Sequence, residues 1–345
     1  MNDYFLKNYT FCSQQNSFFV SSDYVSTGVH INTSFSVPLS MYGCYCVIKL
    51  TPKKLGSAKW ALLNAHCWTV VLDIVFNVLA LPLMFFPSIS GVMLGWGQYI
   101  GIPSWFLLYA IQAIVSVFAS AAIAFFENRQ NALQTNRKIR RKWVRVLLNV
   151  INYSVACGAI LPPYLETFDI QKMALEALKI APCPVKEFFD PRLFFVTDKT
   201  TLMTMLMGLQ TLTLAPQGTF YTLSTWYHLV YSHSSQVSPE TRKMQWRFFM
   251  SSSVQIMIPI GVLTFPLFYV WFSLNSGYYN QELNNHVIVI ASSHGLLASM
   301  CMILVHKVYR HHFVKILTFG KVDLGKQRIV SVVVSSVRSV GHNAV

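Results

Sequence analysis

The residues of this chain best placed to do chemistry are ionisable side chains inside long apolar stretches. Asp73 is the one acid in residues 60–86, which contain no Lys or Arg and are rich in Leu, Val, Ala and Phe. An ionised carboxylate at the centre of a membrane costs about 2.5–3.5 kcal/mol or more unless it faces other helices, water or an ion. Two roles are open for Asp73: part of a conformational switch or ion site within a helix bundle, or a protonated, hydrogen-bonded packing residue.

His294 lies at a similar depth in another apolar segment, residues 284–305. The two side chains can therefore meet across a bundle as a hydrogen-bonded pair. We hypothesise that such a polar centre sets the balance between two conformations. The alternative for His294 is a packing role with its ring nitrogens satisfied locally.

Helices that cross a membrane are the elements that must position these residues. A helix rises about 1.5 Å per residue, so roughly 20 apolar residues cross a hydrocarbon core of about 30 Å and satisfy their backbone polar groups internally. The expected spans are residues 28–48, 60–86, 101–126, 146–165, 200–230, 248–274 and 284–305. The sequence therefore predicts an all-α membrane protein, a bundle of seven transmembrane helices.

The distribution of basic residues decides the orientation of this bundle. With the N-terminus outside, 21 of the 27 Lys and Arg residues fall in inner segments and six in outer ones. Because positive residues mark the cytoplasmic side, we expect the N-terminus outside and the C-terminus in the cytoplasm. The chain then divides into an extracellular N-terminus (1–23), a seven-transmembrane domain (24–310) and a cytoplasmic tail (311–345).

Two segments outside the spans are expected to form short amphipathic helices. Residues 169–180 place apolar side chains on one helical face and are followed by Pro182. Residues 309–317 also place apolar side chains on one helical face, and Arg310 and Lys315 flank that face. This stretch is therefore expected to lie on the inner membrane surface. A cationic tail with incidental apolar residues is the alternative for the second segment.

The outer segments carry two candidates for covalent modification. Cys12 and Cys183 are the cysteines clearly in outer segments, where an oxidising environment permits a disulfide. Whether they pair or stay free is open. Asn8 begins the triplet Asn8-Tyr9-Thr10, a glycosylation sequon that has meaning only outside the cytoplasm.

The composition argues against several classes of protein. Charged residues make up 12% of the chain, about half the usual share in soluble domains, and the net charge of +14 is spread between apolar segments, so no nucleic-acid partner is expected. The sequence shows no metal-ligand spacing of cysteines, no HExxH, no GxSxG and no phosphate-cradling Gly loop, so we expect no metal, no cofactor and no enzyme activity. Two alternatives are a small-molecule transporter, for which internal repeats are not visible, and a seven-span ligand-gated channel, whose inverted orientation the charge bias opposes.

Five stretches, in order along most of the chain, resemble the nematode serpentine receptors of class H. They are Thr51-Pro52-Lys53-Lys54, Phe126-Glu127-Asn128-Arg129, Pro182-Cys183-Pro184, Tyr278-Tyr279-Asn280-Gln281, and Ser292-Ser293-His294-Gly295 continuing to Val305-His306-Lys307-Val308-Tyr309-Arg310. The sequence departs from the family at Val308, where the family usually has Pro.

The resemblance implies a chemosensory G protein-coupled receptor in the plasma membrane of nematode sensory neurons, in their cilia. It implies a small environmental ligand bound from the outer side and a heterotrimeric G protein on the inner side. Arg129 stands where an arginine closes the third helix in rhodopsin-like receptors, which makes it a candidate switch residue, although the seventh span lacks an NPxxY motif.

A receptor of this kind needs a ligand cavity, mostly apolar with a few placed polar groups. Depth in the spans alone selects the candidates for its lining. They are Trp105, Tyr109, Gln112, Met203, Gln210, Phe265, Tyr269 and His286. Plain helix packing is the alternative role for each aromatic residue among them.

Overall fold

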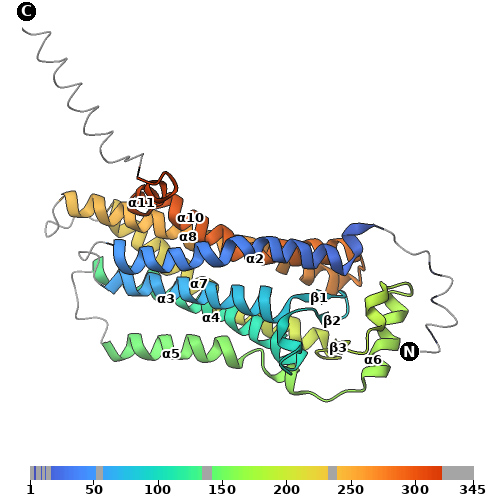
Figure 1. Cartoon of the computed structure of the whole chain (residues 1–345). Helices are drawn as coiled ribbons and strands as arrows, with labels where there is room; N and C mark the ends of the chain where they lie inside the picture. Colours follow the sequence, from blue (N-terminus) through green and yellow to red (C-terminus); the bar gives the residue numbers. More distant parts are fainter. Residues whose placement is uncertain are drawn as a thin grey trace, which may run out of the picture.

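The protein is described from a computed structural model. The structure describes residues 4, 9, 12, 17–51, 57–133, 142–231 and 239–320. Long helices run side by side, and a small β-sheet with helix α6 lies at one end of the bundle while helix α11 lies at the other (Figure 1). These ends are called the sheet end and the α11 end.

The bundle is built from helices that follow the seven apolar segments in order; the protein is mostly helical, and not all-α as expected, because it also contains a small sheet. They are α2 (Ser22–Tyr45), α3 (Ser57–Asp73), α4 (Ser104–Leu133), α5 (Lys142–Gly158), α7 (Thr200–Val230), α8 (Pro239–Ser276), α9 (Gln281–Ser292) and α10 (His294–Val305). The helices α2 and α3 continue as π-helical turns over Cys46–Leu50 and Ile74–Ala80. The seventh segment is formed by α9 and α10 together, with a break at Ser293.

Within the residues that the structure describes, four helical segments are long and apolar enough to cross a membrane: Ala58–Ala80, Ser104–Leu133, Glu240–Ser276 and Gln281–Val305. The remaining ones are shorter or more polar, since α5 has 17 residues and α7 is rich in Thr. In α7, the hydroxyls of Thr211 and Thr219 donate to the carbonyls four residues earlier, at 2.9 Å in both cases. Such local bonds make threonine tolerable in an apolar environment.

Two of the predicted spans end earlier than expected. The second was predicted through residue 86, but its helical structure ends at Ala80 because Leu81 adopts a left-handed conformation (φ 43°) and Pro82 has no amide hydrogen to offer. The fourth was predicted through residue 165, and its α-helix ends at Gly158. The residues that follow form a short 3₁₀ turn at Pro162–Leu165.

Residues 82–84, which were predicted to belong to the second span, form one strand of a three-stranded antiparallel sheet. Strand β1 (Pro82–Met84) pairs with β2 (Ser90–Met93), which pairs with β3 (Phe194–Phe195) from the segment before α7. All residues of the three strands are buried. The sheet therefore ties two connecting segments together over the sheet end of the bundle.

The two expected amphipathic helices are present as α6 (Ile170–Ile180) and α11 (Lys307–Leu317). Asp169 caps α6, because its carboxylate accepts hydrogen bonds from the Gln171 and Lys172 amides at 2.8 and 3.3 Å. Helix α11 packs on the bundle through Tyr309, whose hydroxyl lies 2.6 Å from the Thr51 hydroxyl.

The buried apolar side chains form two separate cores, one toward each end of the bundle. Along the seventh segment, Ala291 belongs to the core of the sheet end and Met302 to the core of the α11 end. The residues between them include several buried polar side chains. A polar layer thus separates the two apolar cores.

Candidate functional site

The polar layer consists of buried side chains from α2, α3 and the two halves of the seventh segment. Its members are Ser36, Ser40, His66, Asp73, Asn77, Ser292, His294 and Ser299, each at most 2% exposed. Burying so many polar groups is costly unless they are hydrogen-bonded to one another. Their pairing therefore decides whether these helices fit together.

Asp73 is the centre of this layer and joins three helices. It is the last residue of α3, and its carboxylate accepts hydrogen bonds from the Ser36 hydroxyl of α2 and from the Asn77 amide at 2.7 Å. The same Asn77 amide donates to the Ser292 backbone carbonyl at 3.1 Å. The carboxylate thus lies at the junction of α2, α3 and the end of α9.

The break in the seventh segment brings a helix start against this carboxylate. Helix α10 begins at His294, and a Cβ atom on Gly295 would lie 2.5 Å from the Asp73 Cγ atom, so the backbone of α10 approaches the carboxylate as closely as a residue without a side chain permits. The lack of a side chain at Gly295 therefore lets α10 pack directly against Asp73.

His294 is fully buried next to Asp73, and the two interact electrostatically. The expected direct hydrogen bond between them is not formed. The Nδ1 atom of His294 instead lies 2.8 Å from the Ala291 carbonyl oxygen. Its Nε2 atom lies toward the Thr69 backbone and lacks a hydrogen bond of ordinary geometry among the described residues.

The layer continues toward the α11 end through smaller polar contacts. The Ser40 and Ser299 hydroxyls lie 2.8 Å apart, which links α2 to α10. The His66 Nε2 atom lies 3.1 Å from the Ser40 carbonyl oxygen and links α3 to the same place. The polar layer is therefore a continuous set of contacts among α2, α3 and the seventh segment.

Arg129 lies outside this layer, near the α11 end of α4. It is 4% exposed, its guanidinium lies 5.3 Å from the centre of the Phe248 ring of α8, and its Nε and Nη2 atoms make no hydrogen bond within the part of the chain that the structure describes. The nearby Glu127 forms a two-pronged ion pair with Arg145 of α5, at 2.7 and 2.8 Å. A buried guanidinium with unused donors is costly.

Residues 20–319 match the family described as "Serpentine type 7TM GPCR chemoreceptor Srh". The chain belongs to this family. A similar protein is "Serpentine receptor class H-72" of Caenorhabditis elegans, 25% identical over 305 residues that cover 87% of this chain and 88% of the relative.

Membership of the Srh family confirms the resemblance found in the sequence. The family is one of seven-helix membrane chemoreceptors and not of enzymes, so the chain is an integral membrane protein of the receptor type. The polar layer and Arg129 both lie within the matched residues.

Five of the eight residues selected by depth as lining a ligand cavity fall into two separate groups in this Srh receptor. In the first group, the Tyr109 hydroxyl donates to the Cys157 carbonyl, Gln112 accepts from Tyr164, and Gln210 donates to two carbonyls of α5. In the second, Tyr269 donates to Asn284 at 2.8 Å, and the His286 ring lies 2.7 Å from the Tyr24 hydroxyl. These side chains hold helices together.

The other three depth candidates divide between core and surface. Met203 is buried in the apolar core of the sheet end, at 1% exposure. Trp105 and Phe265 are 39% and 60% exposed, and their place in a ligand cavity stays a prediction. Depth along a helix does not decide which face of it a residue occupies.

Cys12 and Cys183 are joined in a disulfide at the sheet end. Ion pairs support the same region: the Arg192 guanidinium holds the pKa of Asp190 below its ordinary value, and a hydrogen bond from Lys199 does the same for the pKa of Glu166. Asn8, with its sequon, and the tail beyond residue 320 lie outside the described residues.

Sequence reasoning missed several partners of Asp73. Asn77 stands four residues after Asp73 and therefore on the same helical face, which was an available signal. Ser36 and Ser292 gave none, because small polar residues are common in apolar segments. Gly295, next to the singled-out His294, gave no signal either, since the close approach it permits is a property of the folded chain.

Proposed function

We propose that this chain is a chemosensory G protein-coupled receptor that binds a small environmental ligand from outside the cell and activates a heterotrimeric G protein inside. The observation that carries the proposal is Asp73, an acid buried at the junction of α2, α3 and the broken seventh segment. Intramembrane acids are functional by default, and a broken helix provides an element with two possible arrangements.

The sheet end is proposed as the extracellular side. It carries the Cys12–Cys183 disulfide, and disulfides persist in oxidising environments. Among the described residues, the opposite end carries basic side chains such as Lys142, Arg242 and Lys307, as expected of the cytoplasmic side. By family resemblance, the site of action is the plasma membrane of sensory neuron cilia.

In the proposed mechanism, Asp73 and His294 set the balance between an inactive and an active arrangement. A ligand that binds one arrangement more tightly shifts the population toward it, as in any two-state receptor. Tyr269 and His286 pass the change on, because each fastens α9 to a neighbouring helix. At the other end, Arg129 takes a new partner when α8 shifts, and the basic loops contact the G protein and anionic membrane lipid.

The proposal is tested with a receptor tagged at both ends and expressed in cells. We expect antibody to reach the amino-terminal tag in intact cells and the carboxyl-terminal tag only after permeabilisation. We also expect membranes holding the receptor to accelerate nucleotide exchange on an added heterotrimeric G protein. The reverse topology would contradict the proposal and direct attention to ion currents.

A further inference from the structure

The sheet end of the bundle is closed over its centre by packed side chains. Phe85, Phe86 and Phe188 are all buried there. The side chain of Gln281 donates to the Met84 carbonyl at 3.0 Å, and that of Asn284 donates to the Phe86 carbonyl at 3.1 Å. A molecule that arrives from this side therefore meets a surface fastened to α9.

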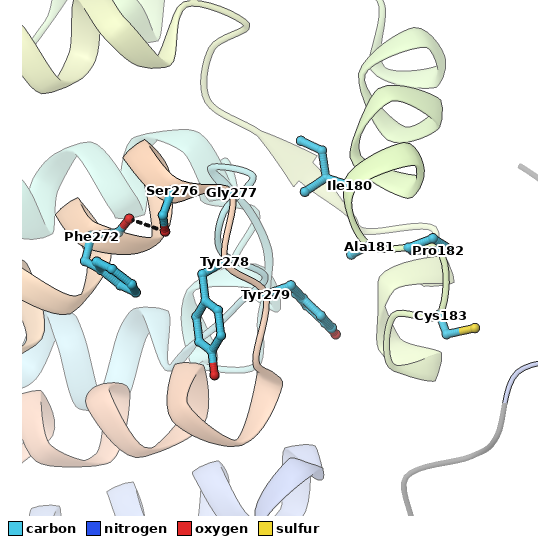
Figure 2. Close-up of a pocket in the computed structure, with 9 residues that line it drawn as sticks. All are labelled: Ile180, Ala181, Pro182, Cys183, Phe272, Ser276, Gly277, Tyr278 and Tyr279. Carbon is cyan, nitrogen blue, oxygen red and sulfur yellow. Dashed lines mark hydrogen bonds between the residues drawn. The ribbon is translucent and has the colours of Figure 1, made fainter.

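A pocket lies beside this closed surface, with a volume of about 550 Å³. It is called the rim pocket. Its lining includes Ile180, Pro182, Phe272, Ser276, Tyr278 and Tyr279. Figure 2 shows its two walls, the end of α6 on one side and the turn from α8 to α9 on the other, with the Tyr279 ring reaching between them. Small-molecule sites in proteins have volumes of about 300–1,000 Å³.

The two walls come from different elements that meet at Tyr279, whose hydroxyl is hydrogen-bonded to the Val185 backbone. The α6 wall is tied to the amino-terminal segment by the Cys12–Cys183 disulfide and by the Tyr4 hydroxyl, which donates to the Pro182 carbonyl at 2.9 Å. The other wall turns at Gly277, whose φ of 68° suits glycine, and is held by the Ser273 hydroxyl on the Tyr278 carbonyl. A molecule in the rim pocket therefore contacts both elements.

The chemistry of the lining selects a neutral molecule. None of the nine lining residues is Asp, Glu, Lys, Arg or His, and three are aromatic: Phe272, Tyr278 and Tyr279. Burial raises the pKa of the Tyr279 phenol, so this group also stays uncharged. The Tyr278 hydroxyl accepts from the Asn280 amide at 3.3 Å, and within the described residues its own hydrogen is not used as a donor.

The pocket is connected to the polar layer through a single helix. Tyr279 also lines a smaller cavity under the sheet, together with Phe85 and Phe188. Two residues later α9 begins, and this helix ends at Ser292, whose carbonyl accepts from the Asn77 amide beside the buried acid. Any displacement of the Tyr279 turn thus acts on the helix that holds the polar layer in place.

We propose that the rim pocket is the ligand site of this protein and takes a small neutral molecule with an apolar ring and one hydrogen-bonding group. The proposal rests on the proposed receptor function. It places recognition at the junction of α6 with the α8–α9 turn, and it leaves Tyr109, Gln112 and Gln210 as packing residues within the bundle.

The test uses the full-length receptor in phosphatidylcholine nanodiscs and a diazirine-bearing benzyl alcohol as a photoreactive probe. After irradiation, peptide mapping is expected to find adducts concentrated on the lining residues. Labelling by the corresponding benzoate and benzylammonium probes is expected to be about tenfold weaker, since burying their charges is costly.

Three variants test the site itself. Ala181→Trp fills the pocket and Tyr279→Ala removes the ring between the walls, so each is expected to lower labelling by about fivefold or more. Tyr279→Phe keeps the ring and is expected to retain most labelling. Phe268→Ala, an exposed residue of α8 that does not line the pocket, is the matched control and should leave labelling unchanged.

Any of three outcomes would overturn the proposal. These are adducts spread over the lipid-facing residues, equal labelling by the charged probes, and unchanged labelling of folded Ala181→Trp protein. The proposed receptor function fails separately. Pocket labelling in a receptor that never activates a G protein would support the pocket and contradict that function. Activation by neutral aromatic molecules without labelling of the pocket would support the function and refute the pocket.

Discussion

Replacing Gly295 with alanine places a methyl group on the carboxylate of Asp73. The new Cβ atom would lie 2.5 Å from the Asp73 Cγ atom and 2.6 Å from each oxygen, where ordinary contacts begin at 3.4 Å. The carboxylate must therefore move by roughly 1 Å, too far to keep its hydrogen bonds from Ser36 and Asn77. Each hydrogen bond to a charged group contributes about 1.5–3 kcal/mol, and alanine returns up to about 1 kcal/mol of helix propensity, so we expect a net loss of about 2–5 kcal/mol.

The assay is thermal unfolding of the purified receptor in nanodiscs, followed by tryptophan fluorescence. Gly295→Ala is expected to lower the midpoint by roughly 5 °C or more. The matched control is Gly261→Ala in α8, where a Cβ atom would meet no atom within 4 Å and the change should stay within about 1 kcal/mol.

A second substitution identifies the cause of the loss. In the Asp73→Ala background there is no carboxylate to displace, so adding Gly295→Ala should cost at least about 1 kcal/mol less than it does alone. Equal unfolding midpoints for Gly295→Ala and Gly261→Ala would contradict this prediction. So would a loss of stability from Gly295→Ala that is as large in the Asp73→Ala background as in the parent.

Three further outcomes are expected in the same unfolding assay. Asn77→Ala removes the bridge between the buried carboxylate and α9 and should lower the free energy of unfolding by about 1–3 kcal/mol. An unchanged free energy of unfolding would mean that the two acceptors find other donors, and would contradict the prediction. Cys183→Ser opens the link to Cys12 across 171 residues and should cost roughly 3–5 kcal/mol, with a reductant lowering the midpoint of the parent only. Arg192→Ala removes the hydrogen bond that lowers the pKa of Asp190, so the parent should be more stable than the variant at neutral pH. This advantage is present above the unfolded pKa of about 3.9 and is lost as the pH falls further. A stability difference that does not change with pH would contradict the prediction.

The helical bundle was predictable because apolar length is a property of the sequence alone. The amphipathic helix α6 was predictable for the same reason, since its periodicity and the following Pro182 are visible in the chain. The sheet was not, because β1 continues the apolar run of the second span and differs from it only in the bend at Leu81, while β2 and β3 are strands of four and two residues within connecting segments. A buried strand and a buried helix are not distinguished by hydrophobicity.

The position of the polar centre was predictable, but its hydrogen bonds were not. Asp73 and His294 stood out because ionisable residues are rare in membrane spans. The sequence did not reveal that the break at Ser293 would bring Gly295, rather than the histidine ring, against the carboxylate oxygens. Likewise, the exposed positions of Trp105 and Phe265 depend on the rotation of their helices, which packing decides.

The central claim is that Asp73 sets the balance between receptor states, and Asp73→Asn tests it most directly. Basal nucleotide exchange on a heterotrimeric G protein is measured at matched surface expression, with Asp23→Asn, an exposed acid at the start of α2, as control. Weakening the contacts of the buried carboxylate by about 1 kcal/mol should raise basal exchange about fivefold, while the control stays at the parental level. Basal exchange in Asp73→Asn equal to that of the parent would contradict the account.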